Sequence, residues 1–78
     1  MQTYSERITV NPDICNGKPV IRGKRITVHT ILEYLGSGDS IDEILENYPS
    51  LEREDIYASI QFASSVLDNN YVIEPVAG

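Results

Sequence analysis

The chain has 78 residues, a formal net charge of −6 and a single cysteine. A chain of this length forms one small domain with a limited core, and such scaffolds often gain support from a partner subunit. One cysteine excludes an internal disulfide and is typical of a reducing compartment, which predicts a cytoplasmic protein. The N-terminus lacks an apolar signal segment, and no apolar run approaches the roughly 18 residues of a membrane span. The sequence therefore predicts a soluble domain with no membrane partner.

The charges are distributed unevenly along the chain. Residues 1–25 carry five basic and two acidic side chains, a formal +3, whereas residues 26–78 carry one basic and ten acidic side chains, a formal −9. The overall acidity argues against a generic nucleic-acid coat. The dipolar arrangement favours head-to-tail contacts or a basic partner on the acidic side, and the alternative is that both faces are simply solvated.

The chain is predicted to be one domain, 1–78, built from four consecutive parts. These are a flexible N-terminus at 1–5, a strand and hairpin at 6–27, a three-helix bundle at 28–68 and a C-terminal tail at 69–78. The predicted fold class is mostly α: a homeodomain-like helix-turn-helix bundle preceded by a short β-strand and a β-hairpin.

Two segments near the N-terminus have strand character. Residues 6–10 alternate apolar and polar side chains, as in a half-buried strand. Residues 20–27 place β-prone pairs on both sides of Gly23-Lys24, and glycine at the first central position suits a two-residue type II′ turn. That hairpin sets Arg22 opposite Arg25. Like charges in this position need compensation by solvent, a partner's carboxylate or a phosphate.

The first two predicted helices have clear boundaries. Thr27 is a good N-cap for the first helix, which ends at Gly36. The second helix opens with Ser40 and Glu43 at the spacing of a capping box, and it stops before Pro49.

The third predicted helix begins near Glu52 and runs to about Asp68. Its apolar stripe is Ile56, Ile60, Ala63 and Leu67. Phe62 and Val66 make this stripe wider than a globular helix needs. Either the extra width serves a second chain or the N-terminal strands cover it, and the sequence leaves both alternatives open.

The tail after the third helix contains Tyr71, Val72 and Ile73, an apolar, β-prone patch typical of an edge strand or a docking peptide. Together with Phe62 and Val66, these three residues are the candidate dimer or partner interface.

The sequence predicts no enzyme, and no catalytic, metal-binding or cofactor-binding residue. Cys15 has no recognisable partner group for nucleophilic catalysis, so a buried, inert thiol is expected. His29 is the only histidine, which leaves too few ligands for a transition-metal site. Gly17-Lys18 is followed by Pro19 and a strand, not by the serine or threonine and the helix of a phosphate loop.

A short turn between the second and third helices suggests a helix-turn-helix. In that arrangement the start of the third helix would enter the major groove, but Glu52, Glu54 and Asp55 would face the phosphate backbone and repel it. The basic residues are the better candidates for binding a nucleic acid or another partner. They are Arg7, Lys18, Arg22, Lys24, Arg25 and Arg53.

Two ordered motifs carry a resemblance to a known family. The first is NPDICNGKPVIRGKRITV at residues 11–28, and the second is ILENYPSLEREDI at 44–56, followed by Ala58 and Ala63. They resemble the signature of a widespread prokaryotic family, catalogued as "domain of unknown function four-three-three". The resemblance covers about residues 8–67. This chain departs from the family pattern at Lys24 and Glu52, where threonines are usual.

The resemblance implies a homeodomain-like three-helix fold with an N-terminal β element. Family members look like VapB-type antitoxins of type II toxin–antitoxin systems, which are typically encoded beside a PIN-like ribonuclease. The implied function is to bind and silence that toxin, with repression of the shared operon as a further role at operator DNA. A PIN-type nuclease has an acidic metal site and often a basic surface for RNA. Either the acidic helices or a cation such as Arg22 or Arg25 would therefore be able to block it.

Three functions remain open on the sequence: an antitoxin-like protein-binding module, a DNA-binding transcriptional regulator, and a small dimeric interaction scaffold. A homodimer is expected under all three, because the core is small and the third helix has a wide apolar stripe.

Overall fold

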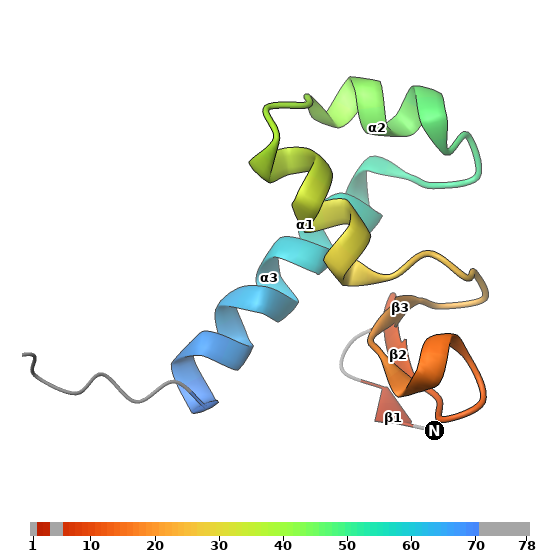
Figure 1. The fold of residues 1–78 in the computed structure, drawn as a ribbon, viewed down its shortest axis with the longest axis vertical. Coiled ribbons are helices and arrows are strands. Elements are labelled where there is room, and N and C mark those ends of the chain that lie inside the picture. Colours follow the sequence, from red (N-terminus) through yellow and green to blue (C-terminus); the bar gives the residue numbers. More distant parts are fainter. Residues whose placement is uncertain (1, 4–5, 71–78) are drawn as a thin grey trace, which may run out of the picture.

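The computed structural model of the protein describes residues 2–3 and 6–70. Its elements are β1 (Gln2–Thr3), β2 (Ile8–Val10), a 3₁₀ turn (Cys15–Gly17), β3 (Val20–Ile21), α1 (Val28–Gly36), α2 (Ile41–Asn47) and α3 (Arg53–Asn70). Three helices surround one core, and the small sheet lies at one end of the molecule (Figure 1). The predicted mostly helical three-helix fold with an N-terminal strand and hairpin is confirmed. Within the described residues, no helix combines the length and the apolar character needed to cross a bilayer.

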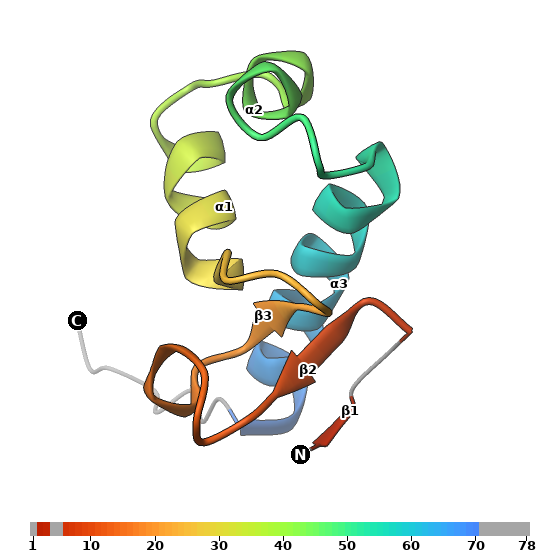
Figure 2. The ribbon, with the colours of Figure 1, turned by 90° about the vertical axis from the view of Figure 1, so that its right-hand side faces the viewer.

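The sheet is antiparallel, with β2 between β1 and β3 (Figure 2). Ile8 pairs with Ile21 across β2 and β3, and both side chains are buried against the helices. The sequence assigns 1–5 to a flexible N-terminus, but Gln2–Thr3 form the edge strand β1, which pairs with Thr9 and Val10. Pairing with β2 supplies the partner strand that such a short segment needs for its backbone hydrogen bonds.

The hairpin after β3 has the predicted register. Val20 pairs with Thr27, and the N–H of Ile21 donates to the carbonyl of Ile26 at 3.0 Å. The strands therefore close where the sequence expects them to, and the loop between them spans residues 22–25.

The turn within this loop differs from the prediction. Lys24 donates its N–H to the carbonyl of Ile21 at 2.9 Å, so Arg22-Gly23 occupy the central positions, not Gly23-Lys24. Gly23 has a φ of +76°, which suits the second central position of a type II turn. The predicted two-residue II′ turn at Gly23-Lys24 is therefore wrong. The N–H of Arg22 instead donates to the carbonyl of Arg7 in the chain just before β2, at 2.7 Å.

The predicted caps of α1 and α2 are present. The Thr27 side chain accepts from the N–H of Thr30 at 3.1 Å. Ser40 and Glu43 exchange two bonds, of 3.1 Å and 3.0 Å, which complete the capping box of α2. Each bond satisfies an N–H that has no partner within its helix, so these helix starts are determined by local sequence.

The capping box makes acid stability depend on Glu43. Its hydrogen bonds with Ser40, first from the backbone and then from the side chain, hold the pKa of Glu43 below its ordinary value of 4.5. A lowered carboxyl pKa contributes stability above that ordinary value and loses it as pH falls through the folded-state pKa. We expect Glu43→Gln, which keeps an acceptor, to lose less stability than wild type between pH 6 and pH 3 in urea titrations. Glu46→Gln, in α2 but outside the box, should lose as much as wild type.

The core forms where the sheet meets the three helices. Its buried apolar residues are Ile8, Ile21, Val28, Ile31, Ile44, Leu51 and Ile56. Helices α1 and α3 lie side by side below α2, and β2 contacts α3 (Figure 2).

The buried face of α3 differs from the predicted stripe. Ile56 and Ser59 are fully buried, whereas Ile60 is 42% exposed and Leu67 is 59% exposed. The second half of α3, which includes Leu67, extends away from α2 (Figure 1), so among the described residues fewer elements cover it. Ile60 and Leu67, which the sequence places on one apolar stripe with Ile56, are therefore not buried with it.

Candidate partner-binding site

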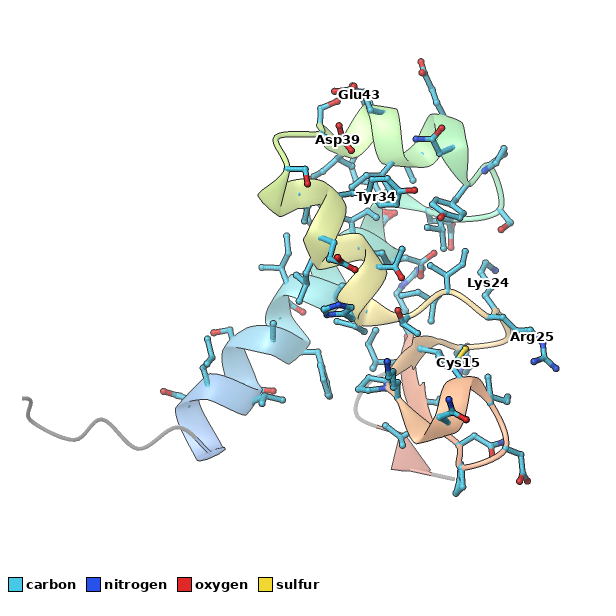
Figure 3. All side chains as sticks on the ribbon, in the orientation of Figure 1. Cys15, Lys24, Arg25, Tyr34, Asp39 and Glu43 are labelled. Carbon is cyan, nitrogen blue, oxygen red and sulfur yellow. The ribbon has the colours of Figure 1, made fainter. Side chains whose placement is uncertain are left out.

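The strongest concentration of available positive charge lies on the segment between the 3₁₀ turn and α1. Lys18, Arg22, Lys24 and Arg25 all come from it, and we call residues 18–25 the basic loop. Lys18, Arg22 and Arg25 are exposed, and Lys24 is half-buried. Figure 3 shows Arg25 pointing away from the body of the protein, with Cys15 just inside the loop.

A tight turn leads into the basic loop. Cys15, Asn16 and Gly17 have φ angles of 50°, 58° and 78°, so three successive residues adopt the left-handed conformation. The N–H of Lys18 then donates to the carbonyl of Cys15 at 3.2 Å. Non-glycine residues adopt this conformation only when surrounding contacts hold them there. The start of the basic loop is therefore fixed by backbone geometry.

The six predicted binding cations separate into two groups in the structure. Arg7 pairs with Asp55 and Glu52, both at 2.9 Å, and Arg53 pairs with Asp42. Among residues 2–3 and 6–70, no ion pair involves the four cations of the basic loop. Arg7 and Arg53 thus serve the fold, and the basic loop holds the cations that remain available to a partner.

A polar hollow of about 210 Å³ lies beside the basic loop. It is lined by Glu6, Arg7, Ile21, Arg22, Lys24, Glu52 and Asp55. Three of these side chains are basic and three are acidic, so the hollow itself is charge-balanced. The excess positive charge therefore belongs to the outer part of the basic loop, at Lys18 and Arg25.

Arg7 and Asp55 join the sheet to the start of α3. Asp55 is 4% exposed; one of its oxygens accepts from Arg7, and the other accepts from the N–H of Glu52 at 2.8 Å. Hydrogen bonds to Asp55 and then to Glu52 raise the pKa of Arg7, so the guanidinium stays protonated. Glu52 and Asp55, which the sequence places at the front of a recognition helix, are therefore engaged within the chain.

Removing the Asp55 carboxylate should destabilise the protein. Asp55→Ala leaves the N–H of Glu52 and one side of Arg7 without an acceptor in a largely buried position, which costs about 1–3 kcal/mol. Asp55→Asn keeps an oxygen for the N–H of Glu52 and should cost less. Urea unfolding at neutral pH measures both values. Equal losses of stability in the Ala and Asn variants would contradict the role of Asp55 as the acceptor that caps the N–H of Glu52 at the start of α3.

A second feature is an apolar groove between α1 and α3, with a volume of about 360 Å³. It is lined by Pro19, Val28, His29, Leu32, Phe62, Ala63, Val66 and Leu67. Of the predicted interface residues, Phe62 packs partly against the core and Val66 is 37% exposed in the groove. Tyr71, Val72 and Ile73 lie outside the described residues. The described N-terminal segment reaches this groove only through Pro19.

The remaining candidates for chemistry are dispersed. Cys15 is half-buried, not fully buried as predicted, and its Sγ lies 3.8 Å from the carbonyl oxygen of Arg25. The exposed His29 contacts Glu33 at 3.1 Å on the next turn of α1. In the described part of the chain, no three His, Cys, Asp or Glu side chains lie close enough to hold a metal ion.

These features define a small trihelical domain with a three-stranded sheet at its N-terminal end and a basic loop beside that sheet. The chain belongs to the family described as "Protein of unknown function (DUF433)", whose model matches residues 8–63. The matched segment contains the basic loop and the first part of α3.

Two relatives show how this domain occurs elsewhere. An uncharacterized protein, y4eO, from Sinorhizobium fredii (strain NBRC 101917 / NGR234) is 37% identical over 60 residues, covering 77% of this chain but 27% of that protein. A crystal structure of a DUF433 member from Anabaena variabilis ATCC 29413 superposes with a TM-score of 0.75 at 34% identity, covering 80% of this chain and 61% of that one. The chain thus spans roughly a quarter and three fifths of these relatives' lengths.

Proposed function

We propose that this protein is an antitoxin-like module that acts in the cytoplasm by binding and neutralising a PIN-like ribonuclease toxin. The observation that carries the proposal is the basic loop, whose four cations have no ion-pair partner among the described residues. A nuclease of that class holds its metal ions with carboxylates. Guanidinium groups bind carboxylates through two parallel hydrogen bonds, so Arg22 and Arg25 match such a target chemically.

The basic loop is suited to binding because its backbone is already held in place. Lys24 is anchored to Ile21, and the N–H of Arg22 is anchored to the carbonyl of Arg7. A loop ordered before binding loses less conformational entropy on association than a disordered one. The backbone that carries the exposed Arg22 side chain is therefore already ordered before a partner's acidic groups approach it.

Co-expression with the product of the adjacent gene tests the proposal. We expect the two proteins to co-purify as a stable complex, growth arrest caused by the partner alone to be relieved, and its RNA cleavage to be inhibited by added purified chain. If the two proteins form no complex and growth arrest is not relieved, the proposed function is contradicted. The absence of only one of these two results would not contradict it.

The same loop favours a second candidate, binding to operator DNA. Helices α2 and α3 are joined by a short connection, residues 48–52, as in a helix-turn-helix. If the four loop cations each contact a phosphate, the logarithm of the binding constant should fall with that of salt concentration with a slope of about −3.6. A mobility shift on the upstream DNA at several salt concentrations measures this slope. Absence of a shift at low salt would exclude the DNA-binding role.

A further inference from the structure

A row of exposed side chains runs along the outer face of α3. Tyr57 is 46% exposed, Ile60 is 42% exposed and Leu67 is 59% exposed, and Ser64 is also exposed between the last two. Their spacing is three, four and three residues, the a/d spacing of helices that pack on another helix. At about 100° per residue the four positions cover roughly 80° of the helix surface. We call Tyr57, Ile60, Ser64 and Leu67 the α3 stripe.

The α3 stripe lies in a stretch without charge. Residues 56–67 contain no acidic or basic side chain, although the whole chain has a net charge of −6. In a twofold-symmetric dimer the same patch of both copies meets itself, so any charge in the patch is brought close to an identical charge. An uncharged stripe avoids this repulsion. The acidic surfaces of α2 and of the start of α3 would each meet an identical acidic surface and repel it. The charge pattern therefore favours a second copy of this chain as the occupant.

The position of the stripe leaves space for a second helix. The C-terminal half of α3, which includes Ser64 and Leu67, extends away from α2 (Figure 1), and the apolar groove lies between α3 and α1. Phe62 and Val66 face that groove, and only Leu67, at the end of the row, lines both surfaces. The α3 stripe is therefore a different surface from the one that the sequence suggests.

We propose that the α3 stripe is the interface of a homodimer in which the α3 helices of two copies pack antiparallel and cross at Ser64. This crossing sets Ile60 of each copy against Leu67 of the other. A small residue at the crossing lets the two helices approach closely. One helix pair of about three turns buries less than the roughly 800 Å² per partner of a standard interface, so a micromolar, concentration-dependent dimer is expected.

Sedimentation from about 5 to about 500 µM, a range that brackets the micromolar affinity of a small interface, tests the proposal in the full chain. Wild type should shift from monomer to dimer across this range, and Ile60→Glu with Leu67→Glu should raise the dissociation constant at least tenfold. Both substituted residues are exposed, so circular dichroism should show the variant folded. Ser65→Glu adds a charge to the same half of α3 outside the stripe, and it should dimerise as wild type does. A wild type that stays monomeric at the highest concentration would overturn the proposal.

Disulfide trapping tests the predicted geometry. Helices 8–10 Å apart, with Cα atoms about 2.3 Å from each axis, bring Ser64 and its symmetry mate to a Cα separation of about 3.4–5.4 Å, and the upper part of this range allows a disulfide. In a Cys15→Ser background, Ser64→Cys should form a cross-linked dimer under mild oxidation, and Ser65→Cys should not. Equal cross-linking of both variants would overturn the antiparallel crossing. So would protection of the introduced thiol within a monomer, which would mean that the chain's own tail covers the stripe.

The dimer proposal stands apart from toxin binding, because the basic loop and the α3 stripe share no residue. A double Glu variant that is monomeric but still neutralises the partner would support both proposals. Loss of toxin binding by that folded variant, together with a wild type that stays monomeric in sedimentation, would show that the stripe holds the toxin, and it would overturn the assignment of the stripe to a second copy.

Discussion

Ile56→Ala is expected to lower the free energy of unfolding by about 2–5 kcal/mol, because it removes a fully buried side chain from the centre of the core. A domain of this length has a total stability of roughly 4–12 kcal/mol. The variant should therefore lose a large fraction of the total stability. Urea denaturation followed by circular dichroism measures the loss.

Ile60→Ala is the matched control, one turn further along the same helix. Ile60 is 42% exposed, so the same substitution should cost well under ~1 kcal/mol when measured at low micromolar concentration, where the monomer dominates. The contrast depends only on burial, since residue type, helix and substitution are the same. Similar losses for both variants would contradict the assigned face of α3.

Arg22→Glu should weaken the proposed complex with a PIN-like toxin at least about 100-fold. Disrupting a close charge pair at an interface costs about 2–5 kcal/mol or more, and reversing the sign adds repulsion from the toxin's carboxylates. Arg22 is exposed, and its structural hydrogen bond comes from the backbone N–H, so the fold should be unaffected. Titration calorimetry of the purified proteins measures the change.

Arg53→Glu makes the same charge change away from the basic loop, and it should reduce toxin affinity less than tenfold. Arg53 is exposed and pairs with Asp42, so its loss affects a surface contact of small energetic value. If both variants weakened binding equally, the effect would reflect overall charge and not the basic loop.

The parts of the fold that were predictable from sequence are those determined by neighbouring residues. Thr27 begins α1, and Ser40 with Glu43 begins α2, because each cap joins groups three residues apart. The register of the hairpin was also predictable, since β-prone pairs flank a short loop that contains Gly23.

The features that the sequence did not reveal depend on distant contacts. The pairing of Arg7 with Asp55 joins residues 48 positions apart, so the charges alone suggested a binding cation and a repelling carboxylate. The inward face of α3 depends on where α1 and β2 lie, which is why the sequence placed Ile60 on one apolar stripe with the buried Ile56. In a helix segment without charges, the apolar spacing is compatible with burial of more than one face, and tertiary packing determines which face is buried. The 3-4-3 spacing of the α3 stripe was nevertheless present in the sequence as a signal.

The attachment of Arg7 to Asp55 and Glu52 also has a consequence for the order of folding. Helices α1, α2 and α3 follow one another through short connections, whereas closing the sheet onto α3 requires a loop of more than forty residues and its entropic cost. We expect the helices to associate before the transition state and β2 to dock after it. Arg7→Ala should then accelerate unfolding while leaving the refolding rate nearly unchanged in stopped-flow experiments. In this order of events, the arginine that joins the sheet to α3 governs how long the native state lasts, not how quickly it is reached.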